Sequence, residues 1–202
     1  MMYLGIDPAK EGAAVLMSNE GEVTDVWSWK YRKRKKPIYQ TLHTCSTSHQ
    51  VLHRELELRD GGTIAKHISA EIDLLFEVRV GIEDAYVNVN HKKTDSLYKS
   101  KINASVQSGL RVARFGGEMI GGLSSCLGYK IESIDYVMAV KWRKQVLRLN
   151  PYTKRDTCKE VSLSTIPVLC PSIHKHLQMH GQLDHITDAV GVALWLRSHH
   201  EY

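Results

Sequence analysis

The sequence predicts an α/β fold in which a mixed sheet, an antiparallel meander followed by parallel strands, is flanked by helices. Three short apolar runs joined by tight turns open the chain, and this spacing is typical of an antiparallel meander. Further along, apolar runs of strand length alternate with segments of helical period, which is typical of parallel strands connected by helices.

The opening meander is predicted within the first 29 residues. Its strands are expected over residues 3–6, 12–17 and 23–29. The basic run KYRKRKK at 30–36 has no apolar period, so we expect a loop that is either solvated or in contact with phosphate through Lys33, Arg34 and Lys35. The stretch 38–62 carries no motif, although residues 51–58 have helical spacing.

Helices and strands then alternate. We expect a helix capped by Thr63, a buried strand over 78–82, a long helix over 95–127, a strand over 129–134, a short helix opening at 140–142, a helix over 154–166 capped by Thr153, and a final amphipathic helix over 184–195. The glycines at 116, 117, 121 and 122 indicate either close backbone approach or a break in the long helix.

The composition is typical of a globular domain, and the net positive charge favours an acidic binding partner. The 202 residues are 43% hydrophobic and 24% charged, with a formal net charge of +5, which favours nucleic acid. The cysteines, Cys45, Cys126, Cys158 and Cys170, have no zinc-ligand spacing and are expected to be reduced. We expect no secretory signal and no membrane partner, and therefore a cytoplasmic protein of a bacterium or of a virus-infected host cell.

Acidic residues stand at three places where side chains can meet. Asp7 ends the first strand, Glu83 ends a central strand, and Asp184 and Asp188 share one face of the last helix, where His185 also lies three residues before Asp188. These acids converge if that helix packs across the sheet. Clustered carboxylates repel one another unless they hold cations, and hard oxygen ligands favour Mg²⁺ or Mn²⁺. Two such ions can drive phosphodiester hydrolysis.

Each acid also has a simpler interpretation. Asp7 precedes Pro8 and fits a turn, and Glu83 with Asp84 fits a loop cap. Asp184 and Asp188 are also favoured near a helix N-terminus by the helix dipole. Their order, on the first strand, a middle strand and the last helix, favours a shared site.

Four segments resemble the RuvC-type Holliday-junction resolvases, a branch of the RNase H-like nucleases. YLGIDPAKEGAAVLM resembles their opening hairpin, VGIEDAYV the strand with the second acid, and LDHITDAVGVALWL the terminal acidic helix. SLYKSKINASVQSGLRVARFGGEMIGGLSSCLGYKIESIDYVMAVKWRKQVL resembles their long helix, the next strand and a lysine-bearing segment. The resemblance covers residues 1–29 and about 63–197. It implies one RNase H-like nuclease domain over 1–202 with an unmatched basic insertion at about 30–62.

The resemblance also implies the site. Asp7, Glu83 and Asp188 match the family's metal ligands, and the fourth ligand stays open between His185 and Asp184, with His185 slightly favoured. Lys141 and Lys154 match lysines near the scissile phosphate. Ala9 departs from the glycine that usually follows the family's Asp-Pro. The implied cofactor is two Mg²⁺ ions per site, with Mn²⁺ able to substitute.

The function expected from these features is structure-selective cleavage of four-way DNA junctions. Because a junction has two-fold character and needs two cuts, a homodimer is expected. The alternatives are a related nuclease acting on flaps, forks or RNA–DNA hybrids, and a branched-DNA-binding protein without catalysis. An actin-like ATPase is excluded because 202 residues are too few for its two duplicated halves.

Overall fold

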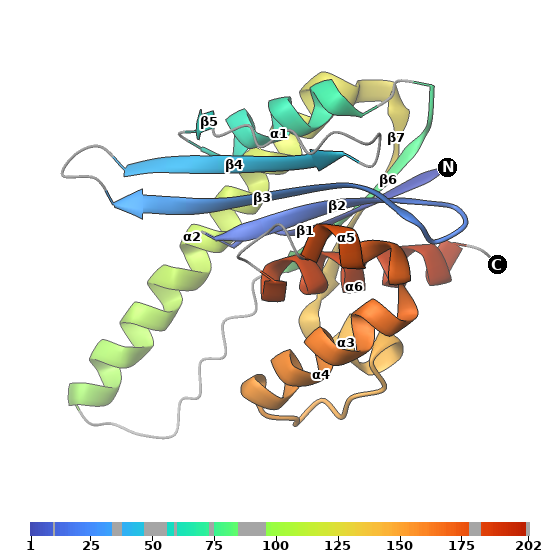
Figure 1. Ribbon diagram of the computed structural model, residues 1–202. Helices are drawn as coiled ribbons and strands as arrows, with labels where there is room; N and C mark the ends of the chain where they lie inside the picture. The colour runs from blue at the N-terminus through green and yellow to red at the C-terminus, as the bar shows by residue number, and fades with distance from the viewer. Residues whose placement is uncertain are drawn as a thin grey trace.

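A single mixed sheet forms the centre of the computed structural model (Figure 1). The structure describes residues 1–9, 11–33, 38–46, 56–58, 60–72, 75–84, 96–177 and 183–200. Over these residues the strands lie in the order β5-β4-β3-β2-β1-β6-β7. Their bounds are β1 (Met2–Asp7), β2 (Gly12–Ser18), β3 (Val23–Lys33), β4 (Ile38–Ser46), β5 (Leu56–Leu58), β6 (Val78–Asp84) and β7 (Ile131–Met138).

Strand directions confirm the predicted mixed sheet, an antiparallel meander followed by parallel strands. Each consecutive pair from β1 to β5 is antiparallel. β6 then pairs parallel with β1, and β7 pairs parallel with β6. The carboxyl ends of β1, β6 and β7 therefore meet at one edge of the sheet.

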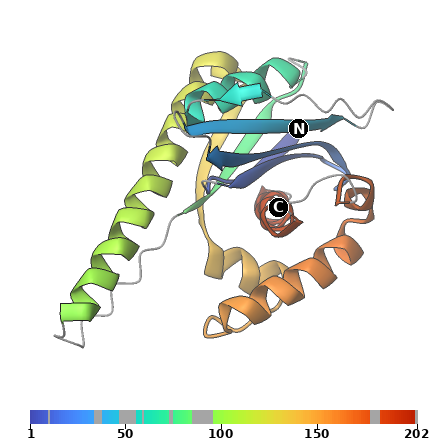
Figure 2. The same cartoon turned by 60° about the vertical axis from the view of Figure 1, so that its left-hand side comes forward.

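Helices cover both faces of the sheet. They are α1 (Gly61–Glu71), α2 (Ser96–Leu127), α3 (Ala139–Val146), α4 (Arg155–Leu169), α5 (His174–Leu177) and α6 (Leu183–His200), with short 3-10 turns η1 (Gly128–Lys130) and η2 (Pro171–Ile173). α1 packs against α2 over one face, and α6 packs on β1, β2 and β6 over the other. Figure 2 shows α6 end-on, between the sheet and the layer formed by α3 and α4.

Alternation along β1 divides its side chains between two cores. Leu4 and Ile6 point to the face covered by α1 and α2. Tyr3 points to the face covered by α6. Because successive side chains of a strand point to opposite faces, Gly5 and Asp7 also lie on the α6 side. The same alternation places Gly81 and Glu83 of β6 on one face.

Two glycines allow α6 to lie directly on the sheet. Gly5 and Gly81 stand opposite each other in the β1–β6 pair. A Cβ atom on Gly5 would lie 2.2 Å from the carbonyl oxygen of Ala189, and one on Gly81 would lie 2.7 Å from Cδ1 of Leu196. The close contact sets the height of α6 above the two strands, and so the distance between their ends and the first turns of the helix.

The hairpin of β3 and β4 corrects the prediction for residues 30–62. β3 continues to Lys33 and pairs with β4 from Asp25 to Lys33, so the loop predicted from residue 30 is wrong for its first part. The backbone groups of β3 and β4 form hydrogen bonds with each other whatever the polarity of their side chains. The end of β3 can therefore form without an alternating pattern of apolar residues. The helical spacing at 51–58 was also misleading, because Leu56–Leu58 forms β5. Residues 34–37 and 51–55 lie outside the described residues.

Capping chemistry moved two predicted helix starts. α1 begins at Gly61 because the Asp60 carboxylate accepts a hydrogen bond of 2.7 Å from the backbone N–H of Thr63, so Thr63 is not the cap. α4 begins at Arg155, preceded by an extended Lys154 without a side-chain cap, so the cap predicted at Thr153 is wrong. The strand predicted over 129–134 lies at 131–138, and the final helix is confirmed over 183–200.

The long helix α2 is continuous through its glycines, which settles the choice between a break and close approach. A Cβ atom on Gly122 would lie 2.6 Å from Cβ of Ala65 in α1. One on Gly116 would lie 3.3 Å from Ile82 of β6. By contrast, Gly117 has nothing within 4 Å of its Cβ position. Gly116 and Gly122 therefore serve packing, whereas Gly117 does not.

The helices of the described ranges give no membrane span. In that part of the chain, no helix combines the length and the apolar character needed to cross a bilayer.

We predict opposite effects of alanine at Gly5 and Gly117. Gly5→Ala should destabilise the protein by about 1–3 kcal/mol or more, because the new methyl group collides with the α6 backbone. Gly117→Ala should stabilise it by up to about 1 kcal/mol, because alanine is the better helix former and the site is open. Urea unfolding of both variants measures the difference. Equal effects of the two substitutions would contradict the close packing of α6.

Candidate active site

The end of β1 and the start of α6 meet through Asp7 and His185. Oδ2 of Asp7 lies 2.6 Å from Nδ1 of His185, and its Oδ1 accepts a hydrogen bond of 3.2 Å from the backbone N–H of Ala9. The Asp7 side chain is only 12% exposed. Asp7 therefore stabilises the turn at Pro8, as the simpler interpretation expects, and also belongs to a buried cluster of polar side chains.

Glu83 of β6 is held by a tryptophan. Nε1 of Trp142 in α3 donates a hydrogen bond of 3.0 Å to Oε2 of Glu83. The Trp142 ring is fully buried against α6, where a Cβ atom on Gly191 would lie 2.4 Å from it. The indole thus fixes the position of the Glu83 carboxyl group relative to both α3 and α6.

Asp188 of α6 completes the cluster. Its Oδ2 accepts a hydrogen bond of 2.9 Å from Nη2 of Arg143, and its Oδ1 accepts one of 3.4 Å from the Ser162 hydroxyl of α4. The same Nη2 lies 3.9 Å from Oε1 of Glu83. Side-chain exposures of 15% for Asp188 and 18% for Glu83 show that both carboxyl groups are largely withdrawn from solvent.

Burial and mutual repulsion disfavour the charge on these carboxyl groups. Desolvation, together with the charges of Asp7 and Asp188, raises the pKa of Glu83 to about 8, although Arg143 and the hydrogen bond from Trp142 oppose this shift. Desolvation also raises the pKa of Asp188 to about 6, against the lowering effect of Arg143. The cluster therefore favours any added positive charge.

The negative charges that disfavour ionised carboxyl groups favour the charged form of His185. Burial alone lowers its pKa, but the hydrogen bond to Asp7 and the charges of Asp7, Asp184 and Asp188 raise the pKa of His185 overall. The cluster lies at the N-terminal end of α6, where the helix dipole also stabilises negative charge.

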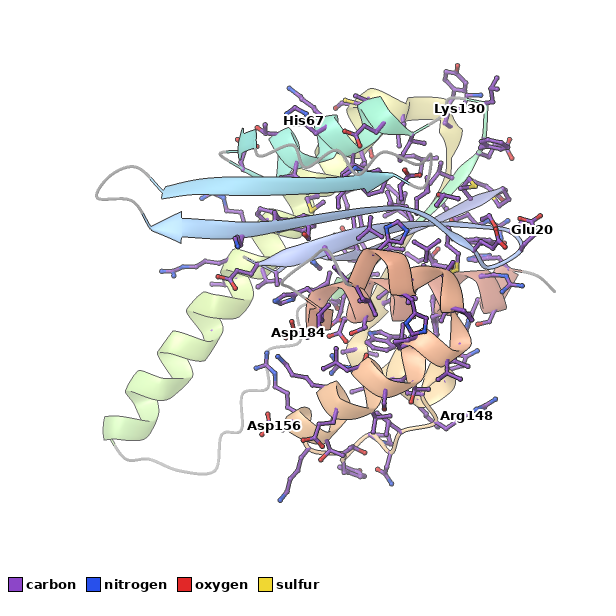
Figure 3. All side chains as sticks on the ribbon, in the orientation of Figure 1. Glu20, His67, Lys130, Arg148, Asp156 and Asp184 are labelled. Carbon is purple, nitrogen blue, oxygen red and sulfur yellow. The ribbon has the colours of Figure 1, made fainter. Side chains whose placement is uncertain are left out.

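Asp184 faces a different partner. Its Oδ2 lies 2.5 Å from Nζ of Lys159 in α4. Burial raises the pKa of Asp184, but the hydrogen bond from Lys159 and nearby charges lower it overall. Figure 3 shows Asp184 at the beginning of α6, on the side of the molecule where Asp156 marks the beginning of α4. The structure therefore separates the two candidates for the fourth ligand: His185 contacts Asp7, whereas Asp184 pairs with Lys159.

None of the predicted basic residues that the structure describes pairs with the carboxyl groups of this cluster. Lys141 is exposed in the first turn of α3, and Lys154 is exposed immediately before α4. Lys33 ends β3, while Arg34 and Lys35 lie outside the described residues. Asp84 follows Glu83 but is exposed.

Trp142, Arg143 and Ser162 were missed by the sequence analysis. The segment VKWRK offers three basic residues in five, and spacing alone does not say which one faces inward. The usable signal was Trp142, since a large apolar residue in a basic helix marks the buried side. Arg143 follows it and lies above its ring, with Cζ 5.1 Å from the centroid.

The donor set fits a divalent cation. Three carboxylates and an imidazole are ligand types that Mg²⁺ or Mn²⁺ accept, and their repulsion is relieved by a cation. Within the described ranges, no three His, Cys, Asp or Glu side chains already converge at ligand distances from one point. Arg143 and His185 pair with the carboxylates instead.

The fold and the site define an α/β protein with a mixed sheet and a buried cluster of acids at the carboxyl ends of its central strands. No protein-family model and no curated protein matches the sequence. Among solved structures, the chain is similar to the Holliday junction resolvase of fowlpox virus, with 9% identity and a TM-score of 0.38. The likeness covers 98% of this chain and 99% of that one.

We predict that Glu83→Gln stabilises the protein in EDTA. A group whose folded-state pKa is raised above its ordinary value of 4.5 costs stability as pH rises toward about 8, and glutamine does not titrate. Glutamine also keeps an acceptor for Trp142. At pH 8 the melting temperature should rise by about 3 °C or more, the scale of 1 kcal/mol for a domain of this size. The gain should shrink as pH falls toward 5.

The matched control is Glu132→Gln. Glu132 is ion-paired with Arg79 on the sheet, and the hydrogen bond from Arg79 lowers the pKa of Glu132. Its substitution should give no stabilisation at any pH between 5 and 8. A Glu83→Gln variant that melts at or below the wild-type temperature at pH 8 would show that the folded protein does not disfavour the charge on Glu83.

Proposed function

We propose that the chain is a structure-selective DNA endonuclease that resolves four-way junctions by metal-dependent phosphodiester hydrolysis. The observation that carries this proposal is the placement of Asp7, Glu83 and Asp188 at the ends of β1 and β6 and in the first turns of α6, largely buried and near enough for their charges to repel one another. Such an arrangement costs stability, and cation-dependent chemistry gives a reason for retaining it.

In this proposal Asp7, Glu83, Asp188 and His185 hold two divalent cations, Mg²⁺ by preference. When bound, these ions would activate a water and stabilise the leaving oxygen. The rest of the work falls to the protein. Trp142 holds the Glu83 carboxyl group at 3.0 Å, and Ser162 restrains Asp188 at 3.4 Å. Fixed carboxylates avoid the cost of reorganisation during the reaction.

Phosphate binding is assigned to the basic residues around this edge. Lys141 of α3 and Lys154 before α4 are exposed, and we propose that they contact the strand to be cut. Lys33, Arg34 and Lys35 are proposed to bind a more distant part of the DNA. Such contacts position the backbone without reading sequence.

The four-way junction as substrate follows from the resemblance of the sequence segments to RuvC-type resolvases. Two symmetric cuts across such a junction need two active sites, so we propose a C2 homodimer.

Cleavage of a synthetic immobile four-way junction in Mg²⁺ tests the function. We expect paired, symmetric cuts in the junction and none in a linear duplex of the same sequence. Flap, fork and RNA–DNA hybrid substrates belong in the same assay. Preferential cleavage of one of them would replace the junction as substrate, and tight junction binding without any cleavage would indicate a binding protein.

We predict that Asp7→Asn abolishes cleavage but keeps junction binding. The substitution removes a carboxylate from the cluster, whereas surface cations supply most of the affinity. Single-turnover cleavage should fall by at least about three orders of magnitude, the scale of several kcal/mol of transition-state stabilisation. Gel-shift affinity in Ca²⁺ should stay within about threefold of wild type, since the lost charge is buried. Full activity of the variant would remove Asp7 from the mechanism.

We predict that His185→Ala impairs cleavage more than Asp184→Asn does. His185 contacts Asp7, whereas Asp184 pairs with Lys159. The histidine variant should lose about 10- to 100-fold in rate. The loss should be larger in Mn²⁺, because imidazole suits that ion better than Mg²⁺.

Asp156→Asn is the control for losing an exposed acid in the first turn of a neighbouring helix. Rates for all three variants are compared in each ion separately. An inactive Asp184→Asn beside a fully active His185→Ala would make Asp184 the ligand.

A further inference from the structure

Arg143 brings a permanent positive charge to two carboxylates of the cluster. Its Nη2 donates to Oδ2 of Asp188 at 2.9 Å and lies 3.9 Å from Oε1 of Glu83. Its side chain is 22% exposed. Its Nε is buried and finds no acceptor in the part of the chain that the structure describes. The guanidinium is therefore held by Nη2, which contacts both carboxylates, and by the Trp142 ring beneath it.

We propose that Arg143 is a positioning residue that acts as an internal counter-cation for Asp188 and Glu83 and competes with divalent cations for them. This inference rests on the proposed function, in which both carboxylates are metal ligands. Arg143 then sets how tightly the site binds Mg²⁺, although it does not ligate the metal.

Competition follows from the geometry at Asp188. Its Oδ1 already accepts from Ser162, and its Oδ2 accepts from Arg143. A cation that takes Oδ2 meets the guanidinium at the same oxygen, and two positive charges a few ångström apart repel. Each carboxylate oxygen has two lone pairs, so it is this repulsion, and not a lack of acceptor sites, that favours withdrawal of Arg143 from Oδ2 when the cation binds.

Withdrawal is easier for Arg143 than for its neighbour. Trp142 is fully buried, donates to Glu83 and is wedged against Gly191. Arg143 reaches the cluster along a flexible stem and leaves Nε unpaired within the described residues. On leaving it gives up one strong hydrogen bond, to Asp188, and the longer contacts with Glu83 and the Trp142 ring. α3 thus carries a fixed support and a displaceable cation at adjacent positions.

A second arginine gives a matched comparison. Arg79 of β6 is paired with Glu132 of β7, with side-chain exposures of 16% and 39%. This pair joins two strands outside the cluster. Removing it breaks an arginine–glutamate ion pair, as removing Arg143 does, but leaves the charge at Asp188 and Glu83 unchanged.

The test is Mg²⁺ binding to the full chain without DNA, measured by calorimetry and by the shift in melting temperature. Wild type, Arg143→Met and Arg79→Met are compared. Arg143→Met should melt lower than wild type in EDTA, yet bind Mg²⁺ about tenfold or more tightly, because one opposing unit charge is gone. Arg79→Met should melt lower in EDTA and in Mg²⁺ alike, with wild-type affinity.

Different results of this test would contradict the role of Arg143 and the proposed nuclease function. Unchanged Mg²⁺ affinity in Arg143→Met would make Arg143 a structural ion pair, and weaker affinity would mean that it orients Asp188 for the metal. Either result overturns the competition while leaving a metal-dependent nuclease in place. A wild type that binds no divalent cation would overturn both.

A second measurement covers the case in which Arg143→Met does not fold. Arg143→Lys keeps the positive charge and should bind Mg²⁺ within about threefold of wild type, since the charge is unchanged. In ¹⁵N-arginine-labelled wild type, the side-chain signal absent from Arg143→Lys belongs to Arg143. This signal should shift as Mg²⁺ saturates the site. A signal that does not move would overturn the proposal.

Discussion

The close approach of α6 to the sheet is the constraint on which the site depends. Gly5 and Gly81 face each other on neighbouring strands and leave room for the α6 backbone, with 2.2 Å between a Cβ on Gly5 and the Ala189 oxygen. Two residues further along each strand, on the same face, stand Asp7 and Glu83. The glycine pair thus determines whether the first turns of α6 can reach the acids. The distances between the side chains of the cluster therefore depend on how closely the α6 backbone packs on the sheet.

The sequence predicts some parts of the fold and of the site better than others. Asp7 and Glu83 could be placed because each ends an apolar run, and a side chain there projects from the edge of a sheet. β4 and the end of β3 could not, because their residues have no apolar period and depend on each other's backbone hydrogen bonds. Arg143 could not be chosen over Lys141 because the two differ only in their rotation about α3, which the packing of Trp142 against Gly191 decides.

The site combines charges of both signs that the protein interior tolerates only together. Glu83 and Asp188 have raised pKa values, while His185 contacts Asp7 and Arg143 contacts Asp188. Removing any one partner leaves another buried charge uncompensated, so the energetic effects of substitutions here are expected to be non-additive. The same charge–charge interactions consequently determine both the local stability of the fold and the protonation of the carboxyl groups in the site.

The contact between Asp7 and His185 joins residues 178 positions apart in the chain. During synthesis, β1 and β6 emerge long before α6, so a nascent chain carries Asp7 and Glu83 without Asp188 or His185. Contacts of such sequence separation form late and slowly in folding. The acids of the sheet therefore meet Asp188 and His185 only after α6 has been synthesised, so the site assembles late, after the strands that carry Asp7 and Glu83 are already present.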